Sequence, residues 1–534
     1  MTSRTRWRVR TRIAFVATAA LALAACGSDD DTPSGSATAT TAAPSSEAPS
    51  TEAPSTEAPS TEAPSTEAPG SSVADTTASS GSTGSAGCPA IDSSLDDKYG
   101  QDAGRFISDI NCSMDHPLKA EGDPIVVGFE NPEGDPNGSF PEYSVAAQAA
   151  VDYINSELGG LGADIQNGVP GRPIQLEVCK SAISPDDSQR CANEIISKDP
   201  FVAFSSINFF GNNLSIFTGA GVPAIVITPV TIADFTSEGV YSIGGGGGCL
   251  GVHTGMVEFA TSEFKDVKKV SVPWADTAPG VVCYYDLESK PLDVLAGTVE
   301  GSAERAGSMP GLEHIGVPIK PATPDLTSQV SQILGYDPDV IMFSAQGADC
   351  WNLVGALGAA GWTPDQTPLV LSGACIDFDA MKEAGDLAKG IYFVGSSGAL
   401  LNDPSTIEDP VDQLEATVYQ QKGAEYGLDP ANLQKGFGTA GFIGMMSLWE
   451  QGSEIVVSGG ELTADSIKQS YADTDGDHLF GSTPLSCSTA PKPYIAVCNG
   501  EVSATQWDGT QLVPVRERFS GVDLVAGTEL KPGP

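Results

Sequence analysis

The sequence predicts an α/β protein of two doubly wound lobes, preceded by a disordered tether. From Pro124 onward, short runs of β-branched residues alternate with longer amphipathic segments, an order typical of βαβ units and parallel sheets. The alternation extends over about 410 residues, enough for two sizeable hydrophobic cores. Before it, Ser, Thr, Ala, Pro and Glu dominate, and such a composition does not form a core.

The first βα unit spans Pro124 to Gly160. Its strand, Ile125–Phe129, leads through a loop rich in Gly, Pro and Asn into a helix whose apolar residues recur at i, i+3 and i+4 up to Leu158. Gly159 and the glycine after it end that helix. Its free N–H groups would lie at the carboxyl end of the strand, where α/β proteins bind small ligands, although an ordinary βα unit has the same pattern.

The remaining elements follow the same alternation. We expect further strands at Ile174–Val178, Phe201–Phe204, Ala224–Ile227, Lys269–Val272, Glu313–Ile319, Val340–Phe343, Leu369–Leu371 and Ile391–Val394. We expect helices at Ser144–Leu158, Ser184–Lys198, Asn213–Gly219, Gly251–Phe264, Tyr284–Ala306, Leu326–Leu334, Cys350–Ala360 and Asp377–Ala384.

The N-terminus has the composition of a secretion signal. Five arginines between residues 4 and 12 are followed by an apolar run of about 13 residues, shorter than the roughly 20 that a membrane span needs. The segment Leu23-Ala24-Ala25-Cys26-Gly27 resembles the lipobox of bacterial lipoproteins, in which the cysteine carries the lipid. We therefore expect a signal peptide over residues 1–25 and lipidation at Cys26, the alternative being a soluble secreted protein with a stray cysteine. No other stretch of the sequence is suited to span a bilayer, so the lipid would be the membrane anchor.

Residues 26–87 form the predicted tether. The pentapeptide Ser-Thr-Glu-Ala-Pro repeats between Ser45 and Pro69, and so polar a segment buries too little apolar surface to offset its ordering entropy. Such a tether would hold the folded part away from the membrane. Residues 88–123 are interpreted as a small disulfide-tied segment that precedes the first lobe.

The charge excludes polyanionic partners. Removal of residues 1–25 takes away five Arg and no acidic residue, so 22 basic and 69 acidic side chains remain, a net charge of −47. A chain of this charge repels nucleic acids, and we expect none as a partner.

The ten cysteines after Cys26 predict five disulfides, because the chain is exported. Spacing does not fix connectivity, and sequence neighbours are the simplest pairs: Cys88 with Cys112, Cys179 with Cys191, Cys249 with Cys283, Cys350 with Cys375, and Cys487 with Cys498. A zinc site is the competing interpretation, but there is no C-x-x-C motif and the four histidines are scattered. We expect no metal and no cofactor.

A series of short motifs resembles the type I periplasmic solute-binding proteins of ABC importers, in particular the branch that binds leucine, isoleucine and valine. The similarity covers residues 124 to 515. Its first motif is the opening strand, loop and helix, which ends in Ile154-Asn155 and Gly159-Gly160. The later motifs, in order, are Gly171 to Leu176 (GRPIQL), Pro185 to Ala192, Gly221 to Ile225 (GVPAI), Asp325 to Val330 (DLTSQV), Pro338 to Ile341 (PDVI), Ala384 to Tyr392 (AGDLAKGIY) and the aromatic-rich Phe442 to Trp449.

The resemblance implies two lobes that are joined by three hinge crossings and close on a ligand. Lobe one would comprise residues 124–246 and 397–470, and lobe two residues 247–396 and 471–534, with a C-terminal extension. In that extension we expect a hairpin with its turn at Asn499-Gly500. Gly-rich stretches at 244–248 and 395–398 fall at the crossings, where glycine absorbs changes in φ and ψ.

In this family, hydroxyl and backbone groups of two strand-end loops of lobe one hold the ligand. Here the resemblance favours Thr231, with Ser206 or Asn208 opposite and Pro229 in the same loop as Thr231. Hydroxyl and N–H groups suit a carboxylate or amide oxygen, although such residues also serve as turns that bind their own backbone. The opening loop would add three residues at the ligand's edge: Ser139, Phe140 and Tyr143.

Lobe two departs from the family pattern. Amino-acid binders carry a carboxylate after the strand equivalent to Leu369–Leu371, whereas this chain has Ser372, Gly373 and Ala374 there. The nearest acid, Asp377, also fits a helix cap. An apolar acid, an amide or another neutral solute is therefore an alternative to an amino acid. The other lobe-two candidates at the ligand are Trp274, Gln346 and Gly373.

No motif indicates an enzyme or a calcium site. The run Asp473, Asp475, Asp477 lacks the glycine and the bidentate acid of a calcium loop at the required positions. No nucleophile motif or carboxylate pair marks a secreted hydrolase. We expect a monomeric, lipid-anchored receptor at the outer face of the cell membrane that captures a small solute for an ABC permease. A sensor of the same fold that signals to a membrane partner is the alternative.

Overall fold

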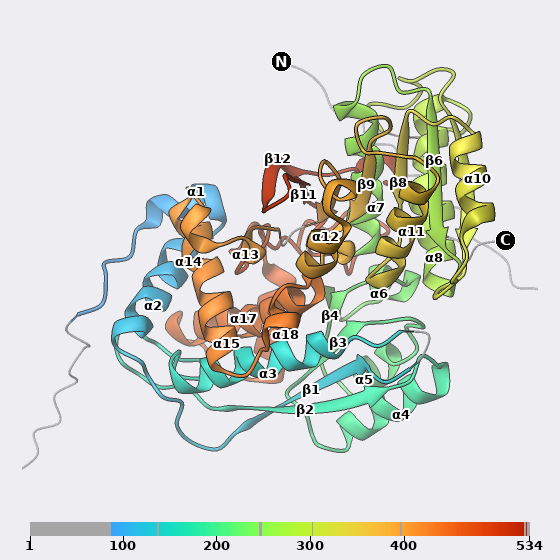
Figure 1. The fold of residues 1–534 in the computed structure, drawn as a ribbon. Coiled ribbons are helices and arrows are strands. Elements are labelled where there is room, and N and C mark those ends of the chain that lie inside the picture. Colours follow the sequence, from blue (N-terminus) through green and yellow to red (C-terminus); the bar gives the residue numbers. More distant parts are fainter. Residues whose placement is uncertain are drawn as a thin grey trace, which may run out of the picture. The chain divides into compact units, whose positions relative to one another are not determined.

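The computed structural model describes residues 87–135, 138–244, 248–301, 303–395, 398–527 and 530. The predicted signal peptide, Cys26, the predicted tether up to residue 86 and parts of both Gly-rich crossings lie outside these residues. Among the described helices, none has the length and apolarity that a bilayer crossing requires. The folded part contains two mainly parallel sheets flanked by helices (Figure 1), which confirms the predicted α/β class with two lobes.

Lobe one is built on a parallel sheet with the strand order β2-β1-β3-β4-β5. Val202 and Phe204 of β3 pack into one core cluster and Ala203 into another, because a parallel strand is buried on both faces. This explains why the strands read as continuous apolar runs. The strands are β1 (Ile125–Pro132), β2 (Ile174–Ser181), β3 (Val202–Ile207), β4 (Ala224–Thr228) and β5 (Val240–Ser242). The connecting helices are α3 (Pro141–Ser156), α4 (Pro185–Ile196), α5 (Leu214–Gly219) and α6 (Ile232–Thr236).

Lobe two is built on a sheet with the order β12-β11-β10-β9-β8-β6-β7. Its strands are β6 (Lys269–Ala275), β7 (Glu313–Ile319), β8 (Val340–Phe343), β9 (Leu369–Ser372), β10 (Tyr392–Gly395), β11 (Val502–Trp507) and β12 (Leu512–Phe519). Its helices are α7 (Cys249–Glu263), α8 (Ala278–Tyr284), α9 (Lys290–Ala296), α10 (Thr327–Gly335), α11 (Ala348–Ala359) and α12 (Phe378–Ala384), with single turns η4 (Gly373–Cys375) and η5 (Gly385–Leu387).

The helix predicted at Tyr284–Ala306 differs in the structure. It begins at Ala278, where the Thr277 hydroxyl accepts the Gly280 N–H, and it ends at Ala296, before Gly297 in the left-handed region. Between α8 and α9 the helix widens into a π-helical turn, η3 (Tyr285–Ser289). Such turns change which side chains face inward, and they are frequent at functional sites.

The chain then forms a helical layer and ends in lobe two. Within this layer α17 packs along α3 (Figure 1). The elements are α13 (Gly398–Leu401), η6 (Pro404–Thr406), α14 (Pro410–Thr417), η7 (Val418–Lys422), α15 (Gly423–Glu425), α16 (Pro430–Leu433), α17 (Gly436–Val457), α18 (Ala464–Asp473) and, after β12, η8 (Val522–Leu524).

The expected C-terminal hairpin is β11–β12, which extends the sheet antiparallel to β10. The prediction of its turn was wrong. The turn lies at Asp508 to Gln511, where the Asp508 carboxylate accepts the Thr510 and Gln511 N–H groups and Gly509 has a φ of 105°. Asn499-Gly500 instead precedes β11. Asn499-Gly500 and Asp508-Gly509 both favour hairpin turns, but only Asp508-Gly509 lies between two strands that pair.

The N-terminal described segment packs on lobe one. It contains η1 (Ser93–Leu95), α1 (Asp96–Tyr99) and α2 (Ala103–Asp115), and Phe106 of α2 meets Trp449 of α17 with ring centroids 5.6 Å apart. The described residues contain five disulfides, each between one cysteine and the next cysteine along the chain: Cys88–Cys112, Cys179–Cys191, Cys249–Cys283, Cys350–Cys375 and Cys487–Cys498.

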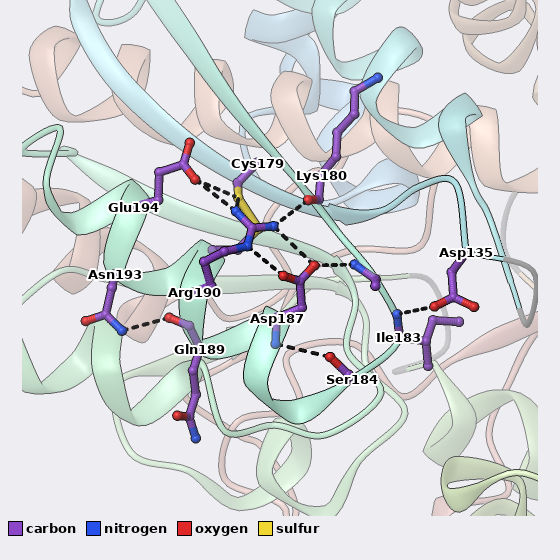
Figure 2. Close-up of polar contacts among 12 residues, drawn as sticks. Asp135, Cys179, Lys180, Ile183, Ser184, Asp187, Gln189, Arg190, Asn193 and Glu194 are labelled. Carbon is purple, nitrogen blue, oxygen red and sulfur yellow. Dashed lines mark hydrogen bonds and ion pairs between the residues drawn. A yellow bond between two sulfur atoms is a disulfide. The ribbon is translucent and has the colours of Figure 1, made fainter. Parts of the chain in front are cut away.

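Helix α4 is fixed to the edge strand β2 by a polar network (Figure 2). Ser184 caps the helix by accepting the Asp187 N–H. Arg190 donates to Asp187 and Glu194 on its own helix and to the Lys180 carbonyl at the end of β2. The disulfide Cys179–Cys191 joins the same two elements. The network therefore holds α4 against the carboxyl end of the edge strand β2.

Candidate ligand-binding cleft

A cavity of about 130 Å³ lies where the carboxyl ends of both sheets meet. This is the position at which open α/β sheets bind ligands. Lobe one contributes the ends of β3 and β4, and lobe two contributes the ends of β9 and β10 and the start of α7. The lining residues are Ile207, Ile227, Thr228, Val230, Gly244, Gly248, Cys249, Val252, His253, Ala345, Gln346, Ser372, Gly373, Ala374, Gly395, Gly436, Phe437 and Ala440.

A backbone contact joins the start of α17 to lobe two beside the cavity. The Gly436 N–H donates to the Ile376 carbonyl at 3.2 Å, and the Phe378 N–H donates to the Gln434 carbonyl at 3.3 Å. A Cβ at Gly436 would lie 2.6 Å from the Gly373 carbonyl oxygen. Glycine is therefore required for this close approach.

The lobe-one wall offers one hydroxyl and an aromatic layer. Thr228 lines the cavity, and its Oγ1 lies 2.6 Å from the Tyr143 hydroxyl in a hydrogen bond. Tyr143 stacks on Phe437 at 4.9 Å, and Phe140 meets the same ring edge-on at 5.4 Å. Burial raises the pKa of Tyr143 well above its usual value, so its phenol stays neutral.

The lobe-two wall contains a buried chain of three polar residues. His253 of α7 lines the cavity, and its Nδ1 lies 3.0 Å from Glu288 Oε1. Ser344, at the end of β8, donates to Glu288 Oε2 at 3.1 Å. Glu288 is fully buried and is turned inward by the π-helical turn η3. Burial raises the pKa of Glu288, and the neighbouring His253 opposes that rise.

A disulfide fixes the two helices that hold this chain. Cys249–Cys283 links the first residue of α7 to α8, which continues into η3. Among the described residues, Cys249, His253 and Cys283 are the one group with ligand atoms close enough for a metal ion. Zinc binds thiolates, however, and these two sulfur atoms are bonded to each other. The group therefore serves to position α7 against α8.

A larger hollow of about 960 Å³ adjoins the cavity at Gly373 and Gly395. It lies among α13, α14 and the β11–β12 hairpin. Its charged side chains have both signs: Lys98 pairs with Asp409 within the lining, whereas Arg516 and Arg518 pair with Glu258 and Glu501 outside it. The smaller cavity is the better candidate site, because it is lined by the carboxyl ends of strands from both sheets.

The sequence model of the periplasmic binding protein family matches residues 124–481. The chain belongs to this family. The family consists of extracytoplasmic solute-binding proteins rather than enzymes.

Solved structures share the fold of this periplasmic binding protein. A branched-chain amino acid ABC transporter protein from Thermus thermophilus with bound valine is 14% identical, with a TM-score of 0.58 over 76% of this chain and 99% of that one. A solute-binding protein from R. palustris in complex with 4-hydroxybenzoate is 16% identical, with a TM-score of 0.54 over 74% and 97%. An ABC transporter substrate-binding protein from Sphaerobacter thermophilus is 17% identical, with a TM-score of 0.53 over 77% and 100%. No curated protein matches the sequence significantly.

Two of the expected site residues of this binding protein, Gln346 and Gly373, line the cavity. Phe140 and Tyr143 lie one layer behind it, against Phe437. The Pro229 carbonyl accepts the Cys249 N–H at 2.9 Å and so fixes the start of α7.

The other expected residues have partners inside the protein. Thr231 and Asp377 cap α6 and α12, respectively. Ser206 donates to Asn131, and the Ser139 hydroxyl accepts the Gly134 N–H. The remaining two are Asn208, which donates to Asn213 and Asp234, and Trp274, which stacks on Tyr284.

Sequence reasoning missed His253, Glu288 and Phe437 as residues of the cleft or its support. His253 was counted only as a scattered histidine, because its partner Glu288 lies 35 residues away, within a π-helical turn. A signal was present in the position of His253 four residues after Cys249, on the first turns of the helix that follows the Gly-rich crossing. Residues there face the carboxyl ends of the strands.

Proposed function

We propose that this protein captures a small solute, an amino acid or a related carboxylate or amide, in the cavity between its lobes and delivers it to an ABC permease. The observation that carries the proposal is the cavity at the carboxyl ends of both sheets, walled by residues of both lobes. The likeness to binders of valine and of 4-hydroxybenzoate supports a ligand of this size and class.

Closure of the two lobes would couple binding to delivery. The contacts from Gly436 to Ile376 and from Phe378 to Gln434 join the lobes on one side of the cavity. A ligand that touches both walls stabilises the state in which these contacts form, and it shifts the population toward that state. The permease would then distinguish the closed, loaded protein from the open one.

Titration of the full-length protein with a panel of amino acids, carboxylates and amides tests solute capture. A true ligand at 100 times its Kd should stabilise the folded state by about 2.7 kcal/mol, seen as a higher melting temperature. Mass spectrometry of small molecules released on denaturation provides an independent check. The absence of both a thermal shift and a released solute would contradict the proposal.

Delivery to a permease is tested by uptake of the identified solute into cells that lack this protein. Loss of uptake supports transport, and unchanged uptake with a lost cellular response would favour a sensor.

We also propose attachment to the outer face of the membrane through lipid on Cys26. The substitution Cys26→Ser should release the protein into the medium, and its retention at the membrane would contradict the lipid anchor.

A further inference from the structure

Two long helices begin at the cavity. Gly248 and Cys249 at the start of α7 line it, as do Gly436 and Phe437 at the start of α17. The N-cap of α7 is Gly248, which has no side chain, and the side chain of Lys435, the N-cap of α17, does not bond the first backbone N–H groups. The first N–H of each helix already donates to a backbone carbonyl, Cys249 to Pro229 and Gly436 to Ile376. The partial positive charge of the two helix N-termini still favours an anionic group in the cavity.

His253 adds an independent polar group at the same cavity. The residue is only 7% exposed, and Nδ1 is the ring nitrogen that faces Glu288. Among the described residues, no hydrogen-bond partner or ion pair is found for Nε2, and the residue lines the cavity. Because Glu288 holds the Nδ1 side of the ring, Nε2 is the nitrogen that remains to meet the contents of the cavity, and it donates a hydrogen bond there in the forms of the ring that carry a proton on it.

The cavity has no group that would neutralise a ligand ammonium. None of the described lining residues is Asp, Glu, Lys or Arg, and His253 is the one ionisable side chain among them. A buried ammonium without an adjacent carboxylate loses its hydration without compensation. The rest of the wall is largely apolar, with Ile207, Ile227, Val252 and Phe437.

We propose that His253 binds the carboxylate of a small, mainly apolar monocarboxylic acid that lacks an ammonium group. Glu288 and Ser344 act as positioning residues that hold the ring with Nε2 toward the cavity, and the starts of α7 and α17 offset the charge of the anion. This inference rests on the proposed solute-binding function and narrows the ligand class.

Four probes of similar size separate the possibilities in isothermal titration calorimetry on the full-length protein. The probes are 3-methylbutanoate, its neutral amide 3-methylbutanamide, valine, and 3-methylbutylamine. We expect 3-methylbutanoate to bind at least about tenfold more tightly than any of the others, because a hydrogen bond to a charged group is stronger than one to a neutral group. Equal or tighter binding of valine or of the amine would overturn the inference and leave the proposed function standing.

His253→Gln should remove most of this preference. The glutamine amide donates a hydrogen bond without charge, so the affinity for 3-methylbutanoate should fall about tenfold or more while that for the amide changes less than about threefold. His314→Gln is the matched control, because His314 lies on β7 and faces Asp293 instead of the cavity. An unchanged affinity in His253→Gln overturns the role of His253.

Two further measurements keep the inference falsifiable if His253→Gln does not fold. Nitrogen-15 NMR of labelled histidine in the wild-type protein, which has four histidines, should show one ring-nitrogen signal shifting on addition of 3-methylbutanoate. If the four probes are silent, the solute released on denaturation decides. Release of a carboxylic acid without an amine supports the inference. Release of any other solute overturns the inference but leaves the proposed function standing. If no solute is released, both the inference and the proposed function are contradicted.

Discussion

Two buried histidines, one beside the cleft and one between α14 and α17, pair with glutamates in different ways. His478 is 3% exposed, and both of its ring nitrogens face carboxylates, Nδ1 toward Glu450 at 2.9 Å and Nε2 toward Glu415 at 3.2 Å. His253 has a glutamate at one nitrogen only, and the ring borders a cavity. The same pair of residue types therefore engages both ring nitrogens at His478, which borders the larger hollow, and only one at His253, which borders the smaller cavity.

The charge of His478 follows from the engagement of both ring nitrogens. Burial alone would lower its pKa, but the charges and hydrogen bonds of Glu450 and Glu415 outweigh burial and raise the pKa to about 10. The ring is therefore a cation that joins α14 to α17. It also stacks on Phe106 of α2, with centroids 5.9 Å apart, so the N-terminal segment packs on this cluster.

Removal of the His478 charge should produce the largest effect. The substitution His478→Gln leaves two buried glutamates without their cation, and we expect the free energy of unfolding to fall by about 3–5 kcal/mol. Denaturant titration measures this loss. The exposed His116→Gln is the control and should change little. A loss below about 1 kcal/mol would show that the ion pairs of His478 do not stabilise the fold.

The contribution of His478 to the free energy of unfolding should depend on pH. The folded-state pKa of His478 is raised from 6.5 to about 10, so its stabilisation is fully present below pH 6.5 and is lost as the pH rises through about 10. The difference in unfolding free energy between the wild type and His478→Gln should therefore shrink over that interval. A difference that stays constant from pH 6 to pH 10 would contradict a charged His478.

Opening the disulfide beside His253 should combine a loss of stability with a loss of binding. The double substitution of Cys249 and Cys283 by Ser removes a link across 34 residues, worth about 4 kcal/mol. It also frees α7 from α8, so affinity for the bound solute should fall. Replacement of Cys179 and Cys191, which span 12 residues in the polar network of α4, should cost about 3 kcal/mol without changing affinity. If both double substitutions change the affinity equally, the link between α7 and α8 is not what positions His253 for binding.

The smallest expected effect tests the other side of the cleft. Thr231 accepts the Asp234 N–H as the cap of α6, and Thr231→Ala should lower the unfolding free energy by about 1 kcal/mol. If Thr231 also contacts the solute, a loss of affinity will accompany the loss of stability. Stability loss alone assigns Thr231 to the cap and leaves His253 as the main polar contact.

The sequence supported the fold far better than the site. The run Val202–Ile207 is recognisable as a strand because both of its faces are buried. A hydroxyl such as that of Thr231 at a strand end has the same signature whether it caps a helix or meets a ligand. The contact between His253 and Glu288 depends on a π-helical turn, and helical periodicity gives no indication of that turn. A polar contact between residues this far apart in the chain can be recognised only in the three-dimensional structure.

The order of the disulfides has a consequence for how the protein matures. The five bonds pair the ten cysteines after Cys26 in the order of the sequence, with a sequence separation of at most 34 between partners. A chain that emerges from a translocation channel N-terminus first presents each partner soon after the last, before the next pair appears. Joining cysteines in order of arrival would yield the native set directly, without reshuffling, which is otherwise a slow step.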